Sequence, residues 1–87
     1  MIVKDVDLMI DMHDEIRHCE VCDRTDGPFE CHHIWSRGMG GGGRLDIRWN
    51  LIMLCQECHR LAHKHTLTKR TLWGIAAERE VFIMLRK

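Results

Sequence analysis

Apolar residues near the start of the chain recur at the spacing of an α-helix. Val3, Val6, Met9 or Ile10, and Ile16 follow rough helical spacing, and acidic residues lie elsewhere on the helical wheel. An amphipathic helix over residues 3–16 is therefore predicted. A short strand over Met1–Val3 is the alternative for the first residues.

The middle of the chain alternates between apolar runs and turn residues. Asp26-Gly27-Pro28 is a turn signal, and Phe29–Trp35 after it is predicted to be a short strand. Leu51–Leu54 is an uninterrupted apolar run, which favours a buried strand. The glycine-rich residues 37–44 between these strands can approach a phosphate group closely, or serve only as a flexible connection. They do not match the GxxxxGK[ST] phosphate-binding loop.

The last third of the chain predicts two helices. The first covers residues 57–65, and Thr68 is a suitable N-cap for a second helix over residues 69–79. The expected buried side of this second helix consists of Leu72, Trp73, Ile75 and Ala76. Val81–Leu85 either extends the helix or forms a strand.

Two Cys-x-x-Cys pairs frame the apolar middle of the chain, Cys19 with Cys22 and Cys55 with Cys58. This spacing suits four thiolates at the corners of a tetrahedron, the closed arrangement of structural zinc. A disulfide framework is the competing explanation, but the chain has five cysteines and no segment that resembles a signal peptide. We therefore predict a structural Zn²⁺ ion held by these four cysteines.

The length of the chain explains why a metal would be needed. Its 87 residues allow one domain, which on folding removes only about two thirds of the unfolded surface from water. Binding of a structural zinc ion then contributes directly to folding. We predict a single domain over residues 1–87, with a core at about 17–66, an acidic N-terminal segment 1–16 and a C-terminal helical segment 68–87.

Charge is unevenly distributed along the chain. Residues 1–30 carry three basic and nine acidic side chains, a net −6, whereas residues 31–87 carry ten basic and four acidic ones, a net +6. A localised positive face is what a phosphate backbone needs, and a solvated polar surface is the alternative. The acidic segment is expected to pack on the sheet rather than to dock a partner. No apolar run is long enough to span a membrane, so an intracellular, reducing location is expected.

Histidines between and after the cysteine pairs form a second group of candidate ligands. His59 and His63 are four residues apart, so on a helix they face one side and can share one ion, while Cys58 faces another direction. His32 and His33 alternate on the predicted strand, so one can ligate a cation and the other can accept a proton from water. A surface position without a ligand is the alternative for each. Incidental surface positions are expected for His13, His18 and His65.

In their order and spacing these motifs resemble the HNH endonuclease family, in its four-cysteine zinc-knuckle subtype. The matching string spans residues 19–63, about half of the chain, and consists of Cys19-x-x-Cys22, His32-His33-Ile34, Asp46-x-x-x-Asn50-Leu51-x-x-Leu54 and Cys55-x-x-Cys58-His59-x-x-x-His63. The resemblance implies an α+β fold: a small ββα-metal domain stapled by the zinc ion, with flanking helices.

The resemblance also implies a role for individual residues. His33 would be the general base that activates water, and Asn50 would brace the loop between the strands and help to aim that base. His32, in place of the aspartate that many members have, would ligate one catalytic divalent cation together with His59 and His63. An all-imidazole ligand set suits Mn²⁺, Co²⁺, Ni²⁺ or Zn²⁺ better than Mg²⁺. Higher activity with Mn²⁺ or Ni²⁺ than with Mg²⁺ is therefore expected.

Basic side chains flank these motifs in the sequence. The candidates for contacts with DNA phosphates are Arg37, Arg44, Arg48 and Lys64. Arginines that cap or pair locally are the alternative. Trp35 and Trp49 are expected to anchor the core or a loop rather than to stack on bases.

We therefore expect a metal-dependent DNA endonuclease that hydrolyses phosphodiester bonds by a one-metal mechanism. Weak sequence specificity is expected, or specificity supplied by a protein partner. A single site cuts one strand at a time, so a monomer would nick, and a double-strand break would need a dimer or two sequential nicks. A phage origin is compatible with so small a protein. The alternative is a catalytically inactive, zinc-stabilised module that binds DNA or another protein.

Overall fold

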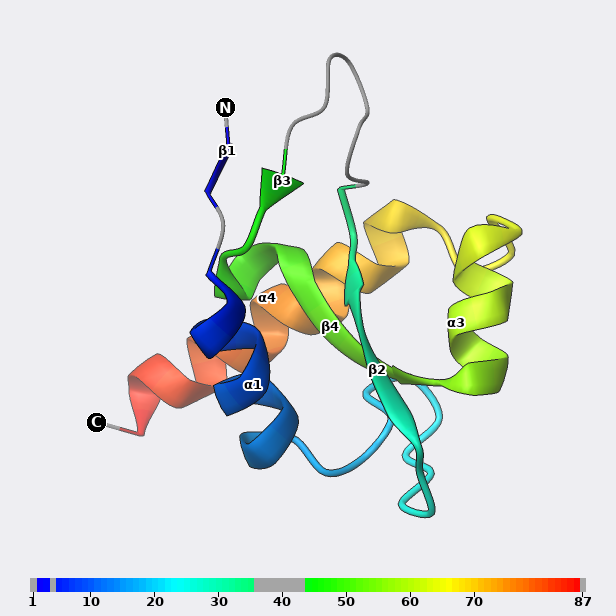
Figure 1. The fold of residues 1–87 in the computed structure, drawn as a ribbon, viewed down its shortest axis with the longest axis horizontal. Coiled ribbons are helices and arrows are strands. Elements are labelled where there is room, and N and C mark those ends of the chain that lie inside the picture. The colour runs from blue at the N-terminus through cyan, green and yellow to red at the C-terminus, as the bar shows by residue number, and fades with distance from the viewer. Residues whose placement is uncertain (1, 4, 36–43, 87) are drawn as a thin grey trace.

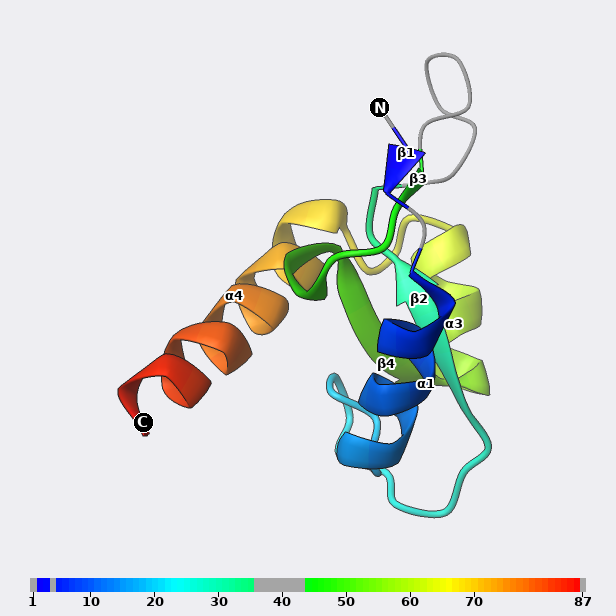
Figure 2. The same cartoon turned by 60° about the vertical axis from the view of Figure 1, so that its left-hand side comes forward.

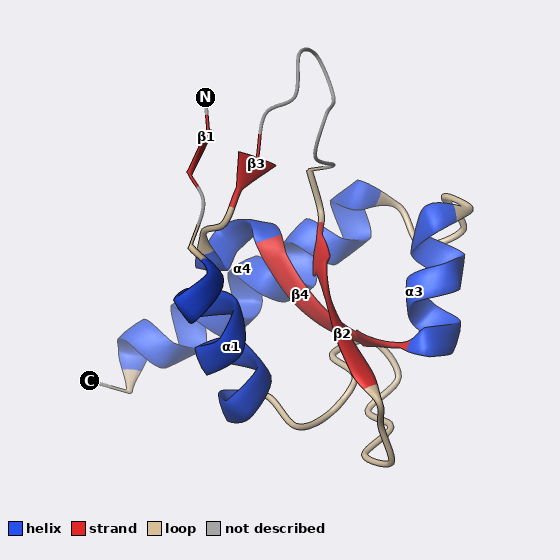
Figure 3. Cartoon of the chain, viewed as in Figure 1, coloured by secondary structure: helices blue, strands red, loops and turns tan. Residues whose placement is uncertain are grey.

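The computed structural model describes residues 2–3, 5–35 and 44–86 (Figure 1). Figure 3 shows where the helices and strands lie in the fold. In chain order the elements are β1 (Ile2–Val3), α1 (Val6–Glu15), β2 (Phe29–His33), β3 (Arg44–Leu45), the 3₁₀ helix η1 (Arg48–Asn50), β4 (Leu51–Cys55), α3 (Gln56–His63) and α4 (Lys69–Leu85). The fold is α+β, as predicted.

β2 and β4 form an antiparallel ribbon at the centre of the fold, and His33 at the end of β2 pairs with Leu51 at the start of β4. All five residues of β4 are buried, because helices cover both faces of the ribbon (Figure 2). Leu51 and Met53 pack against α1, whereas Ile52 and Leu54 pack against α3 and α4. A strand covered on both faces needs an apolar residue at every position, which is the pattern predicted for this segment.

Both predictions for the N-terminal segment are found, one after the other along the chain. β1 pairs in parallel with β3, and α1 begins after Asp5, whose Oδ1 accepts a hydrogen bond from the Leu8 N–H at 3.0 Å. Met12 and Ile16, on the inner side of this segment, are buried against the ribbon. The acidic segment therefore packs on the sheet, as expected.

α3 and α4 begin close to their predicted positions and end elsewhere. α3 stops at His63, because His65 adopts a left-handed conformation with φ of 62°, which ends a helix. α4 is capped by Thr68 as predicted and continues to Leu85, so the last apolar segment extends this helix. Among the described residues, no helix is long and apolar enough to cross a membrane.

The tryptophans are more exposed than predicted. Trp73 was expected on the buried side of α4 but is 37% exposed, whereas Leu72 and Ala76 take that side. Neighbouring residues on a helix point about 100° apart, so Trp73 cannot face the core together with Leu72. Trp35 and Trp49, which were expected to anchor the core or a loop, are 43% and 47% exposed, so neither lies in the core, and a loop-anchoring role stays a prediction.

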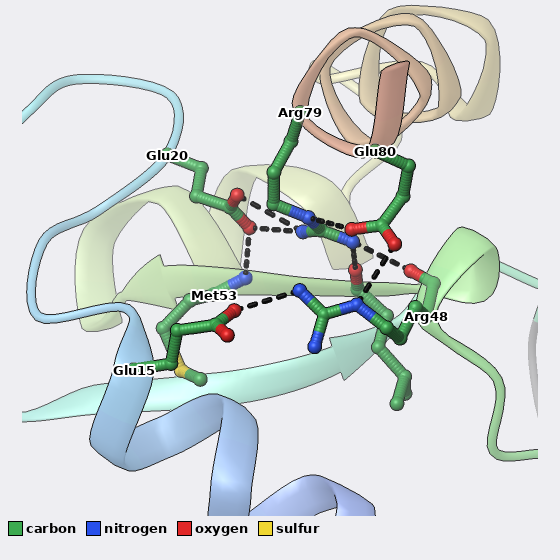
Figure 4. A network of polar contacts seen from close by, with 7 residues as sticks. Glu15, Glu20, Arg48, Met53, Arg79 and Glu80 are labelled. Atoms are coloured by element: carbon green, nitrogen blue, oxygen red, sulfur yellow. Dashed lines mark hydrogen bonds and ion pairs between the residues drawn. The ribbon is translucent and has the colours of Figure 1, made fainter. Parts of the chain in front are cut away.

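A network of ion pairs and hydrogen bonds joins α4 to the rest of the fold (Figure 4). Arg79 donates to both carboxylate oxygens of Glu20, at 2.9 and 2.8 Å, and to Glu80 at 2.7 Å. It also donates to the main-chain oxygens of Arg48 and Leu51, at 2.6 and 3.1 Å. One guanidinium group therefore holds α4 against η1 and the first residue of β4.

The same network continues through a second arginine. Arg48 donates to Glu80 at 2.8 Å and to Glu15 at 2.7 Å, which connects η1 to α4 and to the end of α1. Glu20 also accepts a hydrogen bond from the Met53 N–H at 2.8 Å, on the strand itself. These contacts fix the position of η1, whose last residue belongs to the site described below.

Candidate active site and metal centres

Four cysteines from separate segments meet at one point. Cys19 and Cys22 lie in the loop before β2, Cys55 ends β4, and Cys58 lies in the first turn of α3. Their Sγ atoms all lie within 4.8 Å of one another, and those of Cys22 and Cys55 are 3.8 Å apart. Four thiolates arranged tetrahedrally around zinc at 2.3 Å are about 3.8 Å apart, so these residues fit a structural zinc ion. Each is a free thiol, which argues against the disulfide framework.

The pKa values of these thiols shift in different directions. Burial raises the pKa of Cys19, but hydrogen bonds from neighbouring backbone groups outweigh it and lower this pKa to about 7. Burial raises the pKa of the Cys58 thiol, and the other cysteines around it raise it further. Four thiolates at this distance repel one another unless a divalent cation lies among them. The cluster therefore has the chemistry of a metal site.

β2 and α3 bring three histidines together in a second cluster. The ring centroid of His32 lies 5.0 Å from that of His59 and 5.4 Å from that of His63, and the Nε2 atoms of His59 and His63 are 3.1 Å apart. One ligand atom from each lies within 4.8 Å of the others. Nitrogen ligands arranged tetrahedrally at 2.1 Å around one ion are about 3.4 Å apart, so the three imidazoles fit a single divalent cation.

Two further features suit these histidines to metal binding. The Nδ1 atom of His59 lies 3.3 Å from a carboxylate oxygen of Glu30, which can accept the Nδ1–H and leave Nε2 for the cluster. Burial, together with the charge of His59, His63 and His33, lowers the pKa of His32 to about 4. His32 is therefore neutral at pH 7, which is the form that ligates a metal.

His33 is held by a buried carboxylate. Its Nε2 lies 2.6 Å from Oδ1 of Asp46, and the Asp46 side chain is fully buried. The other oxygen of Asp46 accepts a hydrogen bond from the Asp5 N–H at 2.8 Å, directly before α1. Since a carboxylate accepts, Nε2 of His33 carries the proton, and Nδ1 is left as an acceptor.

Asn50 braces the backbone that follows His33. Its side-chain oxygen accepts a hydrogen bond from the Trp35 N–H at 2.7 Å, and its amide donates to the Trp35 main-chain oxygen at 3.4 Å. The Asn50 main-chain oxygen accepts from the Ile34 N–H at 2.9 Å. Asn50 is buried, so these contacts hold the chain where β2 ends.

A cavity of about 220 Å³ lies between the histidines of β2 and those that follow in α3 and the segment after it. His32 and His33 both line it, although they alternate along the strand, because His33 is the last residue of β2 and lies at its edge. His63 lines it from α3, and His65 and Lys69 line it from the segment that leads into α4. The cavity is therefore lined by two of the three candidate metal ligands, His32 and His63, and by His33, which is held by a carboxylate.

The candidate phosphate contacts lie in different environments. Lys64 is exposed at the end of α3. The guanidinium of Arg48 is half-buried and bound to Glu80, which is evidence against a free phosphate-binding role. Arg44 begins β3, where only its backbone is described, and Arg37 lies outside the described residues.

The sequence patterns did not identify some of the residues that the structure places at the site. Asp46 belongs to the matching string, four residues before Asn50, but its role depends on a contact that spacing does not reveal. Glu30 lies two residues before His32 on the same strand face, so its position could have indicated a carboxylate close to the histidine cluster. His65 was expected to be an incidental surface residue, yet it lines the cavity, and no sequence feature indicated this.

The fold and its two ligand clusters define a small ββα-metal domain with a four-cysteine metal knuckle. The family model for the HNH endonuclease matches residues 19–65, more than half of the chain, and the chain therefore belongs to the HNH endonuclease family. HNH domains are nucleases that act on DNA and use divalent metals, so the family indicates a nuclease in general terms. No curated protein and no solved structure matches the chain.

Proposed function

We propose that this protein is a metal-dependent DNA endonuclease in which His33 activates the attacking water. The observation that carries the proposal is the shared cavity, lined by His33 together with His32 and His63. A base and a metal-binding cluster on one cavity are the two components that hydrolysis of a phosphodiester bond requires. The family match supports the same class of reaction.

The proton chemistry assigned to His33 follows from its hydrogen bond. With Nε2–H donated to Asp46, Nδ1 can accept a proton from a water molecule in the cavity. The Asp46 carboxylate then stabilises the imidazolium that forms, and it prevents the ring from turning its protonated nitrogen toward the water. The Asp5 N–H orients the carboxylate in turn, so α1 contributes to the alignment of the base.

His32, His59 and His63 are the residues that we propose hold the catalytic cation. When bound there, a divalent cation would supply Lewis-acid stabilisation of negative charge on the phosphate and the leaving oxygen. Three imidazoles suit Mn²⁺, Ni²⁺, Co²⁺ or Zn²⁺ better than Mg²⁺, which prefers oxygen ligands. We therefore propose that cleavage is faster with Mn²⁺ or Ni²⁺ than with Mg²⁺.

The products we propose are nicks at weakly selected positions. The described residues contain one cluster of three histidines, and one such centre hydrolyses one strand at a time. Cleavage of both strands would need two copies or two successive nicks. Lys64, exposed beside the site, is our remaining candidate among the described side chains for a contact with the DNA backbone.

The proposal is tested by nicking of supercoiled plasmid by zinc-loaded protein, with Mn²⁺, Ni²⁺ or Mg²⁺ added separately. His33→Ala is expected to abolish nicking, and His33→Gln, which retains a donor for Asp46, controls for loss of folding. Zinc content and far-UV circular dichroism verify that both variants remain folded. Nicking that persists in folded variants would refute the role of His33. Tight DNA binding without cleavage under any metal would favour the alternative, an inactive DNA-binding module.

A further inference from the structure

The cavity beside the catalytic histidines continues onto a basic and aromatic surface. His65 and Lys69 line its far side, and no acidic residue is found among the described residues that line it. The Nζ atom of Lys69 lies 5.7 Å from the centroid of the Trp35 ring, and Trp35 stacks on Trp73 with centroids 6.0 Å apart and ring planes 28° apart. We call these four residues the flanking surface.

The flanking surface is formed by segments that are distant in sequence. Trp35 follows His33 by two residues, directly after β2, while Lys69 and Trp73 lie in the first two turns of α4. In Figure 1 the N-terminal end of α4 approaches the upper end of β2. Residues of both segments, His33 and Lys69, line the histidine cavity. A nucleic acid whose phosphate is at His33 would therefore lie close to the flanking surface, because the two residues from His33 to Trp35 span at most about 7 Å of extended chain.

His65 has a conformation that a smaller residue would adopt more easily. Its φ of 62° lies in the left-handed region, where glycine and asparagine are less strained than histidine. The structure nevertheless has an imidazole at this position, directed at the cavity next to Lys69. A donor for phosphate oxygens explains why a histidine is useful there.

The exposed tryptophan pair indicates that this surface binds a nucleic-acid base as well as a phosphate. Trp35 and Trp73 are 43% and 37% exposed, although both have large apolar rings. Aromatic rings beside a basic groove are the means by which proteins bind single-stranded nucleic acid, because every base has a face that can stack. A paired base in duplex DNA is already stacked on its neighbours and cannot use such a platform.

We propose that the flanking surface binds one unpaired nucleotide next to the scissile phosphate, its phosphate on His65 and Lys69 and its base on the Trp35–Trp73 pair. The protein accordingly prefers single-stranded or locally unpaired DNA to intact duplex. This inference rests on the proposed nuclease function for its orientation relative to His33, but not for the binding itself.

The test compares binding of a short dye-labelled single-stranded oligonucleotide with binding of the duplex of the same sequence. Fluorescence anisotropy is measured on zinc-loaded protein without added catalytic cation, and the oligonucleotide is checked for integrity afterwards. The wild type is expected to bind the single strand more tightly. Trp35→Ala is expected to weaken single-strand binding roughly 5- to 150-fold, the range reported for stacking of one base, and to change duplex binding little.

Matched variants separate stacking from loss of folding. Trp35→Phe keeps a ring and is expected to retain single-strand binding, whereas Trp35→Leu keeps apolar bulk without a ring face and is not. Trp49→Ala removes a tryptophan of similar exposure that is not part of the flanking surface, and it is expected to leave the preference unchanged. For single-strand binding, Lys69→Gln is expected to reduce the slope of log K against log salt concentration by about 0.7, because one phosphate contact is lost. His65→Asn retains the backbone conformation, and it is expected to weaken binding.

The outcomes distinguish this inference from the proposed function. Equal affinity for single strand and duplex, or equal binding by Trp35→Ala and Trp35→Phe, would overturn the flanking surface even if plasmid nicking is observed. Preferential single-strand binding that depends on the Trp35 ring supports it, even if no metal restores cleavage and the nuclease proposal fails.

Discussion

Replacement of Asp46 by asparagine tests the alignment of the proposed base with almost no change in shape. The Asp5 N–H donates to Oδ2 of Asp46, so an asparagine would turn its side-chain oxygen toward that donor. Its NH₂ group would then face His33, where the carboxylate Oδ1 now lies 2.6 Å from Nε2. His33 would have to accept at Nε2, and its proton would move to Nδ1, the nitrogen that we propose faces the water. The substitution would therefore reverse the tautomer that the base needs.

The size of the effect follows from what this reversal removes. Positioned general-base catalysis contributes about 10²- to 10⁴-fold, so Asp46→Asn is expected to slow cleavage by that factor. At 1.36 kcal/mol for each factor of ten, this corresponds to about 2.7 to 5.4 kcal/mol of transition-state stabilisation. The change in folding is smaller, because one hydrogen bond to a charged acceptor contributes about 1.5 to 3 kcal/mol.

Initial rates of plasmid nicking measure the first effect, and thermal unfolding of the zinc-loaded protein measures the second. In a His33→Gln background, Asp46→Asn is expected to cause no further loss of rate, because both substitutions remove the same step. Wild-type cleavage by folded Asp46→Asn would refute the alignment role. An equal further loss in the His33→Gln background would show that Asp46 acts on something other than His33.

Three further outcomes are expected. Arg79→Ala should lower the free energy of unfolding by about 3–5 kcal/mol in chemical denaturation, because Glu20 would remain buried without an ion-pair partner and Glu80 would keep only Arg48; a loss below about 1 kcal/mol, as for exposed pairs, would refute this. Burial raises the pKa of Glu80, but hydrogen bonds from Arg48 and Arg79 outweigh it and lower this pKa, so its stabilising contribution is complete above about pH 4.5 and is lost as the pH falls further. Glu80→Gln should accordingly make the acid side of the stability profile shallower, and an unchanged profile would contradict the assignment. Glu30→Gln should weaken Mn²⁺ binding at the histidine cluster about 10- to 100-fold in isothermal titration calorimetry, because Glu30 would no longer orient the ring of His59. Unchanged Mn²⁺ affinity would exclude this role of Glu30.

The contacts of Arg48 show that its side chain belongs to the ion-pair network. Arg48 was a candidate for phosphate contact because it lies in the basic part of the sequence, close to Asn50. Its guanidinium instead binds Glu80 and Glu15, 32 and 33 residues away along the chain. Burial of such a group requires opposite charge from several elements, and the location of those elements is not visible in local sequence.

Local spacing was sufficient to predict the cysteine cluster and the pairing of His59 with His63. Two residues between paired cysteines and three between His59 and His63 set the directions of side chains within one turn of chain. The strands and the start of α4 were predictable for the same reason, since apolar runs and an N-cap are short-range signals. The place of His32 beside His59 and His63 was predicted from the resemblance to the HNH family.

Only the tertiary structure decided how those ligands become a site. The pairing of His33 with Asp46 spans the glycine-rich residues 37–44, and the contact of Asp46 with Asp5 joins positions 41 residues apart. The stacking of Trp35 on Trp73 likewise depends on where α4 packs against the end of β2. Such contacts depend on the closing of long loops and on the packing of whole helices, which the residue pattern within one element does not encode. The sequence by itself therefore determined which side chains can bind metal, and the packing of α1 and α4 around the ribbon decided which histidine is held by a buried carboxylate and what surface lies beside it.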